Sequence, residues 1–260
     1  MVHLGLASIL LCFMATGGPE EKVNAQNALK GRPRTIHLIE QLTATVIFEG
    51  FDDPRFTLQD ALDYLADRYD LSFDVDEKAF AKAFGKKAPR SVLAEPVAAN
   101  SPIPKMRGIA LERVLKKILE RIDVDSGATF LMHRDQIFIT TGAAASKEIL
   151  GDSSMPLQRL IHRRMEKRLL VDALEEIAEY SDATVVLDES VGEKAKETVS
   201  ARFLNATPET AVRIVADRSG LTVVRMDNVL YVTTREKAAK LREDVERDKK
   251  QARQMPPADE

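Results

Sequence analysis

Two stretches decide the fold of this 260-residue sequence: "DALDYLADRYDLSFDVD", from Asp60 to Asp76, and "DALEEIAEYSDATVVLD", from Asp172 to Asp188. In each, alanine and leucine or isoleucine recur at a spacing that places one apolar stripe along a helix. A turn residue follows, and then a short run rich in β-branched or aromatic residues is typical of a strand. Aligned without gaps, the copies share Asp60/Asp172, Ala61/Ala173, Leu62/Leu174, Ala66/Ala178, Asp70/Asp182 and Asp76/Asp188.

Amphipathic helices can resemble each other by chance, but the downstream sequence repeats as well. Each copy continues with a strand, a second amphipathic helix, and two strands joined by a tight turn. Thr207 is the expected N-cap of the second copy's helix, and Pro208 fits its first turn. Both hairpins close on Thr-Thr. The matching segments are Pro104 to Ile122 and Ala128 to Thr141 in the first copy, and Val199 to Gly220 and Leu221 to Thr234 in the second, with turns at Arg134-Asp135-Gln136 and Met226-Asp227-Asn228. The chain is a tandem repeat of a small unit.

The fold class expected is α+β: two tandem small domains, each with two helices packed with short mixed or antiparallel β-sheets. The stripe residues Leu62, Leu65, Leu174 and Ile177 are expected in the cores. The expected segments are a signal peptide over 1–25, a polar lead-in from Gln26 to about Gln41, a first domain over 43–141 with an insertion at 77–99, a linker over 142–156, a second domain over 157–234 and a charged C-terminal helix over 235–254. A cut within the small, polar linker is expected to give two soluble fragments.

Composition excludes several classes of function. The chain is 44% hydrophobic and 30% charged, which is typical of a soluble globular protein. Aromatic residues make up only 5% and there is no Trp, so the chain lacks the stacking platforms of many single-strand nucleic-acid sites. A net charge of −3 gives no electrostatic reason to expect nucleic acid. Because Cys12 is the single cysteine, an intrachain disulfide and a cysteine zinc cluster are excluded.

The N-terminus favours export. Leu4 to Met14 is an uncharged apolar run of signal-peptide length that is too short to span a bilayer. Cleavage patterns occur at Ala15-Thr16-Gly17 and Val23-Asn24-Ala25, although no Lys or Arg precedes the run. A periplasmic or secreted protein is therefore expected. The alternatives are a lipoprotein anchored at Cys12, against which Leu11 stands, and an apolar N-terminal helix.

No catalytic, cofactor-binding or metal-ligating constellation emerges from the sequence. None of the four histidines (His3, His37, His133 and His162) has a partner at a helical metal-motif spacing, and His133 and His162 are interpreted as ordinary strand residues. Asp74 and Asp76 could bind Mg²⁺ or Ca²⁺ at a strand end, but the second copy has Val186 in place of Asp74. The shared Asp76/Asp188 more simply ends a strand by turning the chain. Asn substitutions of these two residues are expected to cost at most about 1 kcal/mol.

The repeated pattern resembles the secretin and TonB short N-terminal domain, which stands at the periplasmic start of secretin channels and of some TonB-dependent receptors. The matching stretches are "FTLQDALDYLADRYDLSFDVD", "GIALERVLKKIL" and "DQIFITT" in the first copy, and "LLVDALEEIAEYSDATVVLD", "NATPETAVRIVADRSGLTVV" and "DNVLYVTT" in the second. The resemblance implies a compact unit that works by protein–protein contact without catalytic residues. Two copies are present, and the residues outside them are too few for a long run of alternating membrane strands, so only the interaction role is expected to carry over.

Three hypotheses for function follow. The leading one is an exported, non-enzymatic interaction module of the bacterial cell envelope that binds an envelope protein or its own copies through strand edges or helix faces. A membrane contact would arise only through a lipid anchor at Cys12. A ligand-sensing or regulatory periplasmic module would show a small apolar cavity within one unit. An enzyme would show an ordered polar cluster in a deep pocket between the repeats.

Overall fold

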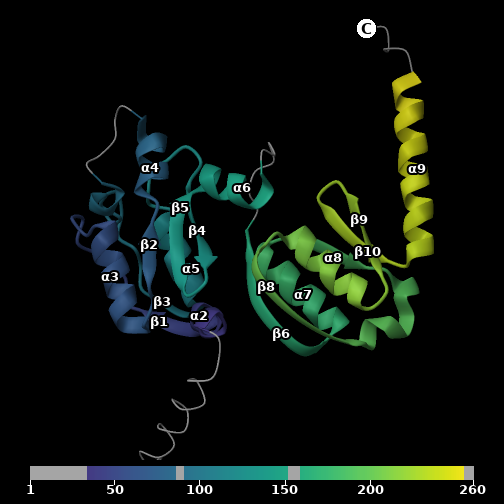
Figure 1. The fold of residues 1–260 in the computed structure, drawn as a ribbon, viewed down its shortest axis with the longest axis horizontal. Helices are drawn as coiled ribbons and strands as arrows, with labels where there is room; N and C mark the ends of the chain where they lie inside the picture. The colour runs from purple at the N-terminus through teal and green to yellow at the C-terminus, as the bar shows by residue number, and fades with distance from the viewer. Residues whose placement is uncertain (1–33, 86–90, 152–158, 255–260) are drawn as a thin grey trace, which may run out of the picture.

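The computed structural model describes residues 34–85, 91–151 and 159–254, and its fold is α+β (Figure 1). The predicted signal peptide, Cys12 and His3 lie outside the described residues. We call residues 34–151 the first repeat and residues 159–254 the second repeat. The first repeat consists of α2 (Arg34–Thr43), β1 (Thr45–Phe48), α3 (Leu58–Tyr69), β2 (Phe73–Val75), α4 (Glu77–Phe84), η2 (Val92–Ala94), β3 (Met106–Ala110), α5 (Leu111–Leu119), β4 (Ala128–His133), β5 (Gln136–Thr141) and α6 (Gly142–Leu150).

The second repeat follows the same order with a shorter excursion after its second strand. Its elements are β6 (Ile161–Leu169), α7 (Leu170–Ser181), β7 (Thr184–Leu187), η3 (Glu189–Lys196), β8 (Thr198–Ala206), α8 (Pro208–Arg218), β9 (Thr222–Met226), β10 (Val229–Thr233) and α9 (Arg235–Gln254).

The two repeats have the same sheet topology. In the first, β1 pairs antiparallel with β3, while β5 pairs parallel with β2 and antiparallel with β4. In the second, β6 pairs with β8, and β10 lies between β7 and β9 with the same directions. The predicted helix–strand–strand–helix–hairpin order is therefore confirmed, as are the two hairpin turns.

Each repeat has its own hydrophobic core. The stripe residues Leu62, Leu65, Leu174 and Ile177 are all buried, as predicted. The first core gathers residues from Leu38 to Ile139, and the second gathers residues from Ile161 to Val232. In the second repeat, α7 and α8 each contact both the β6–β8 sheet and the three-stranded sheet.

The shared aspartates at the helix ends have a conformational role. Asp70 and Asp182 follow α3 and α7 in the left-handed conformation, with φ of 54° and 55°. Their backbone N–H groups donate to the carbonyls of Ala66 and Ala178, which closes each helix. Aspartate tolerates this conformation better than most residues, so the repeat keeps it where the chain turns from helix to strand.

The other shared aspartate pair ends a strand and caps the next helix. Asp76 accepts from the N–H of Ala79 at 3.0 Å, and the Thr140 hydroxyl donates to it at 3.1 Å. In the second repeat, Thr233 donates in the same way to Asp188. The first threonine of each Thr-Thr pair thus holds the aspartate of its repeat.

The second threonine of each pair caps the helix that follows the hairpin. Thr141 accepts from the N–H of Ala144 at 3.2 Å, and Thr234 accepts from the N–H of Lys237 at 3.3 Å. This explains why both hairpins end on the same dipeptide. The expected N-cap Thr207 also accepts from the N–H of Thr210, at 3.3 Å.

Two segments with the composition of loops are helical. The lead-in ends in α2, which buries Leu38, Ile39 and Leu42 on one face. Three apolar positions among polar residues were enough to form an amphipathic helix against the core. The first nine residues of the expected linker form α6, because alanines favour a helix once Thr141 caps it. The remaining linker residues, 152–156, lie outside the described residues.

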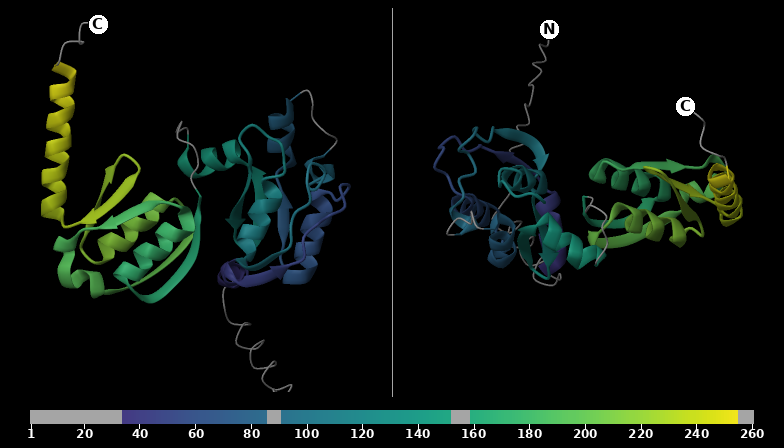
Figure 2. Two further views of the ribbon diagram at one scale, coloured as in Figure 1. Left: turned by 180° about the vertical axis from the view of Figure 1, so that it is seen from behind. Right: turned by 90° about the horizontal axis from the view of Figure 1, so that it is seen from above.

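The insertion at 77–99 contains a short helix, as predicted, and also extends the first core. Phe80 of α4, Val92 of η2 and Val97 are buried. The charged C-terminal helix is confirmed as α9. Its start packs beside β9, where Ala238 is buried, and the rest of the helix extends away from the second repeat (Figure 2).

Candidate site between the repeats

The carboxylates and the exposed histidine considered in the sequence are not brought together. Asp74 is exposed on β2, where its Oδ1 accepts from the N–H of Val75. His133 is a strand residue of β4, as predicted, with its ring stacked on Phe138 at 4.5 Å and its Nε2 2.8 Å from Glu148. Across the described ranges, no group of three or more His, Cys, Asp and Glu residues could hold a metal ion.

His162 is also a strand residue, but it lies in the contact between the repeats. Its ring is 2% exposed and stacks on Phe130 of the first repeat, with centroids 5.4 Å apart. The backbone N–H of Asn205 donates to its Nδ1 at 3.3 Å, so the ring is neutral with its proton on Nε2. Burial, together with the charge of Arg163, lowers the pKa of His162 to about 3.

Asn205 of β8 binds the free edge of β4 in the first repeat. Its Oδ1 accepts from the N–H of Met132 at 2.8 Å, and its Nδ2 donates to the C=O of Met132 at 2.9 Å. One side-chain amide therefore satisfies both backbone groups of an edge residue, as a neighbouring strand would. Asn205 has φ of 51°, a conformation that asparagine tolerates.

A buried ion pair joins α5 of the first repeat to the second repeat. Glu112, which is 2% exposed, accepts from Arg163 at 3.1 Å and from the hydroxyl of Tyr180 in a short contact. The guanidinium of Arg163 lies 3.8 Å from the centre of the Tyr180 ring. Desolvation raises the pKa of Glu112, which the charge of Arg163 opposes, and burial also raises the pKa of Tyr180.

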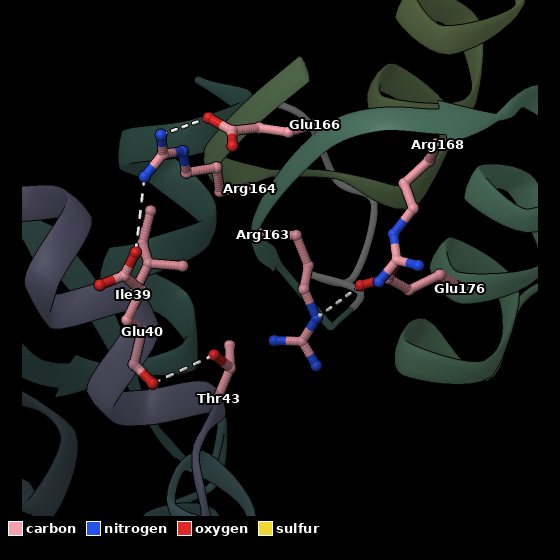
Figure 3. Close-up of a pocket in the computed structure, with 8 residues that line it drawn as sticks. All are labelled: Ile39, Glu40, Thr43, Arg163, Arg164, Glu166, Arg168 and Glu176. Atoms are coloured by element: carbon pink, nitrogen blue, oxygen red, sulfur yellow. Dashed lines mark hydrogen bonds and ion pairs between the residues drawn. The ribbon is translucent and has the colours of Figure 1, made fainter. Parts of the chain in front are cut away.

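Beside these contacts lies a groove of about 490 Å³ between α2 and β6 (Figure 3). Arg164 sits between Glu40 of α2, at 3.4 Å, and Glu166 of its own strand. Arg163 lies 3.7 Å from Glu176 of α7. The groove is lined by Ile39, Glu40, Thr43, Arg163, Arg164, Glu166, Arg168 and Glu176.

The groove's chemistry is that of paired charges. Three arginines face three glutamates, and no histidine, cysteine or serine is among the lining residues. The one lining hydroxyl, on Thr43, donates to the backbone C=O of Glu40 at 3.2 Å. Neither a base-activated nucleophile nor an apolar ligand cavity is formed by these eight side chains. The arrangement instead joins α2 of the first repeat to β6 of the second through Arg164.

No local sequence pattern predicted this site. Glu112, Tyr180, His162 and Asn205 follow no motif, and each contacts a residue from 43 to 73 positions away. The single clue in the sequence was His162, a histidine in a predicted strand. No known protein family and no characterised protein matches this chain. None of the helices in the part of the chain that the structure describes is both long and apolar enough to cross a membrane.

Proposed function

We propose that this chain is an exported, non-enzymatic protein–protein interaction module of the bacterial cell envelope. The observation that carries the proposal is the docking of one repeat on the other. The edge of the β2–β5–β4 sheet is bound by β8 through Asn205, and Phe130 and His162 stack beside it. The repeat is thus a unit whose sheet edge can be recognised by another protein surface.

The resemblance to the secretin and TonB short N-terminal domain supports the same role, because two helices packed with small sheets are the unit it implies. Exposed apolar side chains supply further contact surface. Seven large hydrophobic residues are exposed in the described ranges, six of them in the second repeat: Ile47, Leu169, Val171, Val186, Leu204, Ile214 and Met226. Export is supported by the apolar run near the N-terminus.

The groove favours an interaction module over the enzyme hypothesis. An enzyme would need polar groups in a reactive arrangement, such as a nucleophile beside a base. The lining arginines Arg163 and Arg164 are instead each paired with one glutamate of the first repeat and one of the second. These charges hold two surfaces together, which is the task of a docking contact.

Cross-linking in intact cells tests the proposal. A tagged chain is expressed in its own host, cross-linked, and purified from the envelope fraction. We expect it to be processed near residue 25 and to retain one or more envelope proteins, including its own copies. An unprocessed chain in the cytoplasm, or a chain that retains no protein above the level of an untagged control, would contradict the proposal.

A further inference from the structure

The two-stranded sheets of the repeats carry the same bulge at the same place. In the first repeat, β3 has one extra residue, Gly108, opposite the step from Val46 to Ile47 of β1. In the second repeat, β8 likewise has one extra residue opposite the step from Ile161 to Arg163 of β6. Gly108 and Asn205 both have positive φ, 69° and 51°, and both lie three residues before the first residue of the following helix. Gly108 is therefore the counterpart of Asn205.

The same alignment makes Ile47 the counterpart of His162. Val46 pairs with Ile109 and Ile161 pairs with Ala206, each just before the bulge, and Ile47 and His162 are the next residues. Their exposure differs sharply: His162 is 2% exposed, because the first repeat covers it, whereas Ile47 is 54% exposed. An isoleucine thus lies uncovered at the position that the neighbouring repeat buries.

The three-stranded sheets supply the other half of the contact. In the first repeat, the N–H of Ile137 donates to Ser72 at 2.8 Å, so the backbone groups of Ile137 face β2. Met132 lies opposite Ile137 in the antiparallel pair. Its N–H and C=O therefore point away from β5, along the free edge that Asn205 binds.

The edge of β9 has the same orientation. The C=O of Val232 accepts from the N–H of Asp188 at 2.9 Å, so Val232 faces β7, as does Leu230 two residues earlier. Arg225 lies opposite Leu230 and is the counterpart of Met132. Its N–H and C=O point outward, and no strand lies beside β9 on that side within the described ranges. Helix α9 contacts β9, and its Arg242 donates to the outward C=O of Val223 at 3.3 Å, so the part of the edge left for a partner is the backbone of Arg225. The side chain of Arg225 turns aside to Glu209, at 3.0 Å.

From the exposed Ile47 and the outward backbone of Arg225 we infer that copies of this chain associate head to tail, with the Arg225 end of the β9 edge of one copy (the tail) docking on the β1–β3 sheet of the next (the head). In this contact Gly108 approaches the backbone of Arg225, as Asn205 approaches Met132 within the chain. Ile47 packs beside Val223, which is the counterpart of Phe130. The interface is heterologous, so repeated addition gives an open filament or closes into a ring.

A second copy fits this role better than an unrelated strand because it presents the matching bulge and an exposed apolar residue at the matching position. The contact is weaker than its intramolecular counterpart, since Gly108 has no amide and no covalent link raises the local concentration. Tethering commonly supplies an effective concentration in the millimolar range, so association in solution is expected at micromolar to millimolar dissociation constants. This inference rests on the proposed interaction role and names the partner.

Sedimentation velocity over a range of concentrations tests the inference with four variants of the full chain. Ile47→Glu places a charge on the docking surface of the β1–β3 sheet, the head of the chain. Arg225→Pro removes the outward N–H of the β9 edge, the tail of the chain. We expect each to weaken self-association at least tenfold. Gly108→Asn should strengthen it severalfold, because asparagine tolerates φ of 69° and no atom lies within 4 Å of an added Cβ. Ile214→Glu, which alters an exposed isoleucine of α8, is the matched control and should change nothing.

Mixing the two blocked variants distinguishes head-to-tail assembly from any symmetric dimer. A chain with Ile47→Glu keeps its tail and a chain with Arg225→Pro keeps its head, so the mixture should form a one-to-one heterodimer and stop there. If proline at 225 perturbs folding, oxidation of mixed Gly108→Cys and Arg225→Cys chains gives the same information. Their hetero-disulfide should exceed that of an Ile214→Cys and Arg225→Cys mixture.

The outcomes separate this inference from the proposed function. A chain that stays monomeric up to about 1 mM, or blocked variants that assemble as the unmodified chain does, would overturn head-to-tail association. The interaction role would survive that result if cross-linking still captured another envelope protein. If neither self-association nor a captured protein were found, both would fail.

Discussion

The first and second repeats have one topology but differ in what covers their sheet edges. The β4 edge of the first repeat is occupied by Asn205, while the corresponding β9 edge of the second has no strand beside it in the described residues. Conversely, His162 on the second repeat is covered and Ile47 on the first is exposed. The scaffold residues are therefore kept in both copies, and the surface residues record which contact each copy makes.

The largest expected effects are in the cores and should be equal in the two repeats. Leu65 of α3 and Ile177 of α7 are both fully buried, so truncation to Ala should cost about 2–5 kcal/mol in either case. Calorimetry on each variant measures this. Two transitions, with only one shifted by each variant, would mean that the repeats unfold separately. A single shifted transition would mean that the contact between them couples their unfolding.

A second comparison concerns the shared strand-end aspartates. Asp188 is buried and accepts from Ser190, Thr233 and Lys237, whereas Asp76 is half-buried and accepts from Ala79 and Thr140. The sequence-based limit of about 1 kcal/mol is kept for Asp76→Asn, but Asp188→Asn should cost about 2–3 kcal/mol, since hydrogen bonds to a charged group are lost. Urea unfolding of both variants decides the point, and equal losses would show that the additional contacts of Asp188 contribute nothing.

The same carboxylate has a pH signature. The hydrogen bonds from Ser190 and Thr233, with Lys237, hold the pKa of Asp188 well below its usual range. A carboxyl group with a lowered pKa in the folded state stabilises the fold at pH values above its unfolded-state pKa of about 3.9. This stabilisation is lost as the pH falls through the folded-state pKa. Asp188→Asn should therefore flatten the curve of stability against pH in strong acid, and a curve as steep as that of the unmodified chain would contradict this role of Asp188.

The covered histidine of the second repeat should make stability pH-dependent in milder acid. The pKa of His162 falls to about 3, whereas an unfolded histidine binds a proton below about 6.5. The unfolded state therefore binds more protons between these values, and stability is lost as pH falls through that window. The loss from this residue should be about 2 kcal/mol between pH 7 and pH 5. His162→Phe keeps the stacking on Phe130 and should remove this slope; an unchanged slope would place its origin elsewhere.

A smaller effect than in the cores is expected at Asn205, whose side-chain amide distinguishes the bulge of the second repeat from that of the first. Asn205→Gly recreates the residue of the first repeat, keeps a residue that tolerates φ of 51°, and removes both bonds to Met132. The cost should be about 1–2 kcal/mol, in the coupling between repeats. Gly108→Asn is the reciprocal change and should leave the stability of the monomer within about 0.5 kcal/mol. A larger loss from Gly108→Asn than from Asn205→Gly would invalidate the equivalence of the bulges.

The structural features that could be predicted from the sequence are those encoded by local patterns. The helix stripe with Leu62 and Ile177, the turns and the cap at Thr207 are local patterns of three to ten residues, and the sequence predicted them. Helix α6 was missed because its serine and the glycines Gly142 and Gly151 also suit a loop, whereas the alanines and the cap at Thr141 favour the helix that forms.

The contact between the repeats could not be foreseen in the same way. Asn205, His162 and Glu112 stand at ordinary polar positions, and their partners lie far away in sequence. Only the packed arrangement brings an amide to the Met132 edge or buries Glu112 against Arg163. Once the fold is known, aligning the two repeats indicates which residues make this contact. Equivalent positions that differ in polarity are those whose surroundings differ between the repeats.

Hydrogen exchange at two equivalent amides compares the sheet edge that the chain covers itself with the edge proposed to bind a second copy. The N–H of Met132 is bonded to Asn205, and the N–H of Arg225 points away from β10, along the outer edge of its sheet. At low concentration we predict slow exchange at Met132 and fast exchange at Arg225, with Arg225 becoming protected as concentration rises and only when Ile47 is intact. Equal exchange of the two amides at low concentration, or an Arg225 amide that stays unprotected at all concentrations, would contradict the account of a repeat built to dock by its sheet edge.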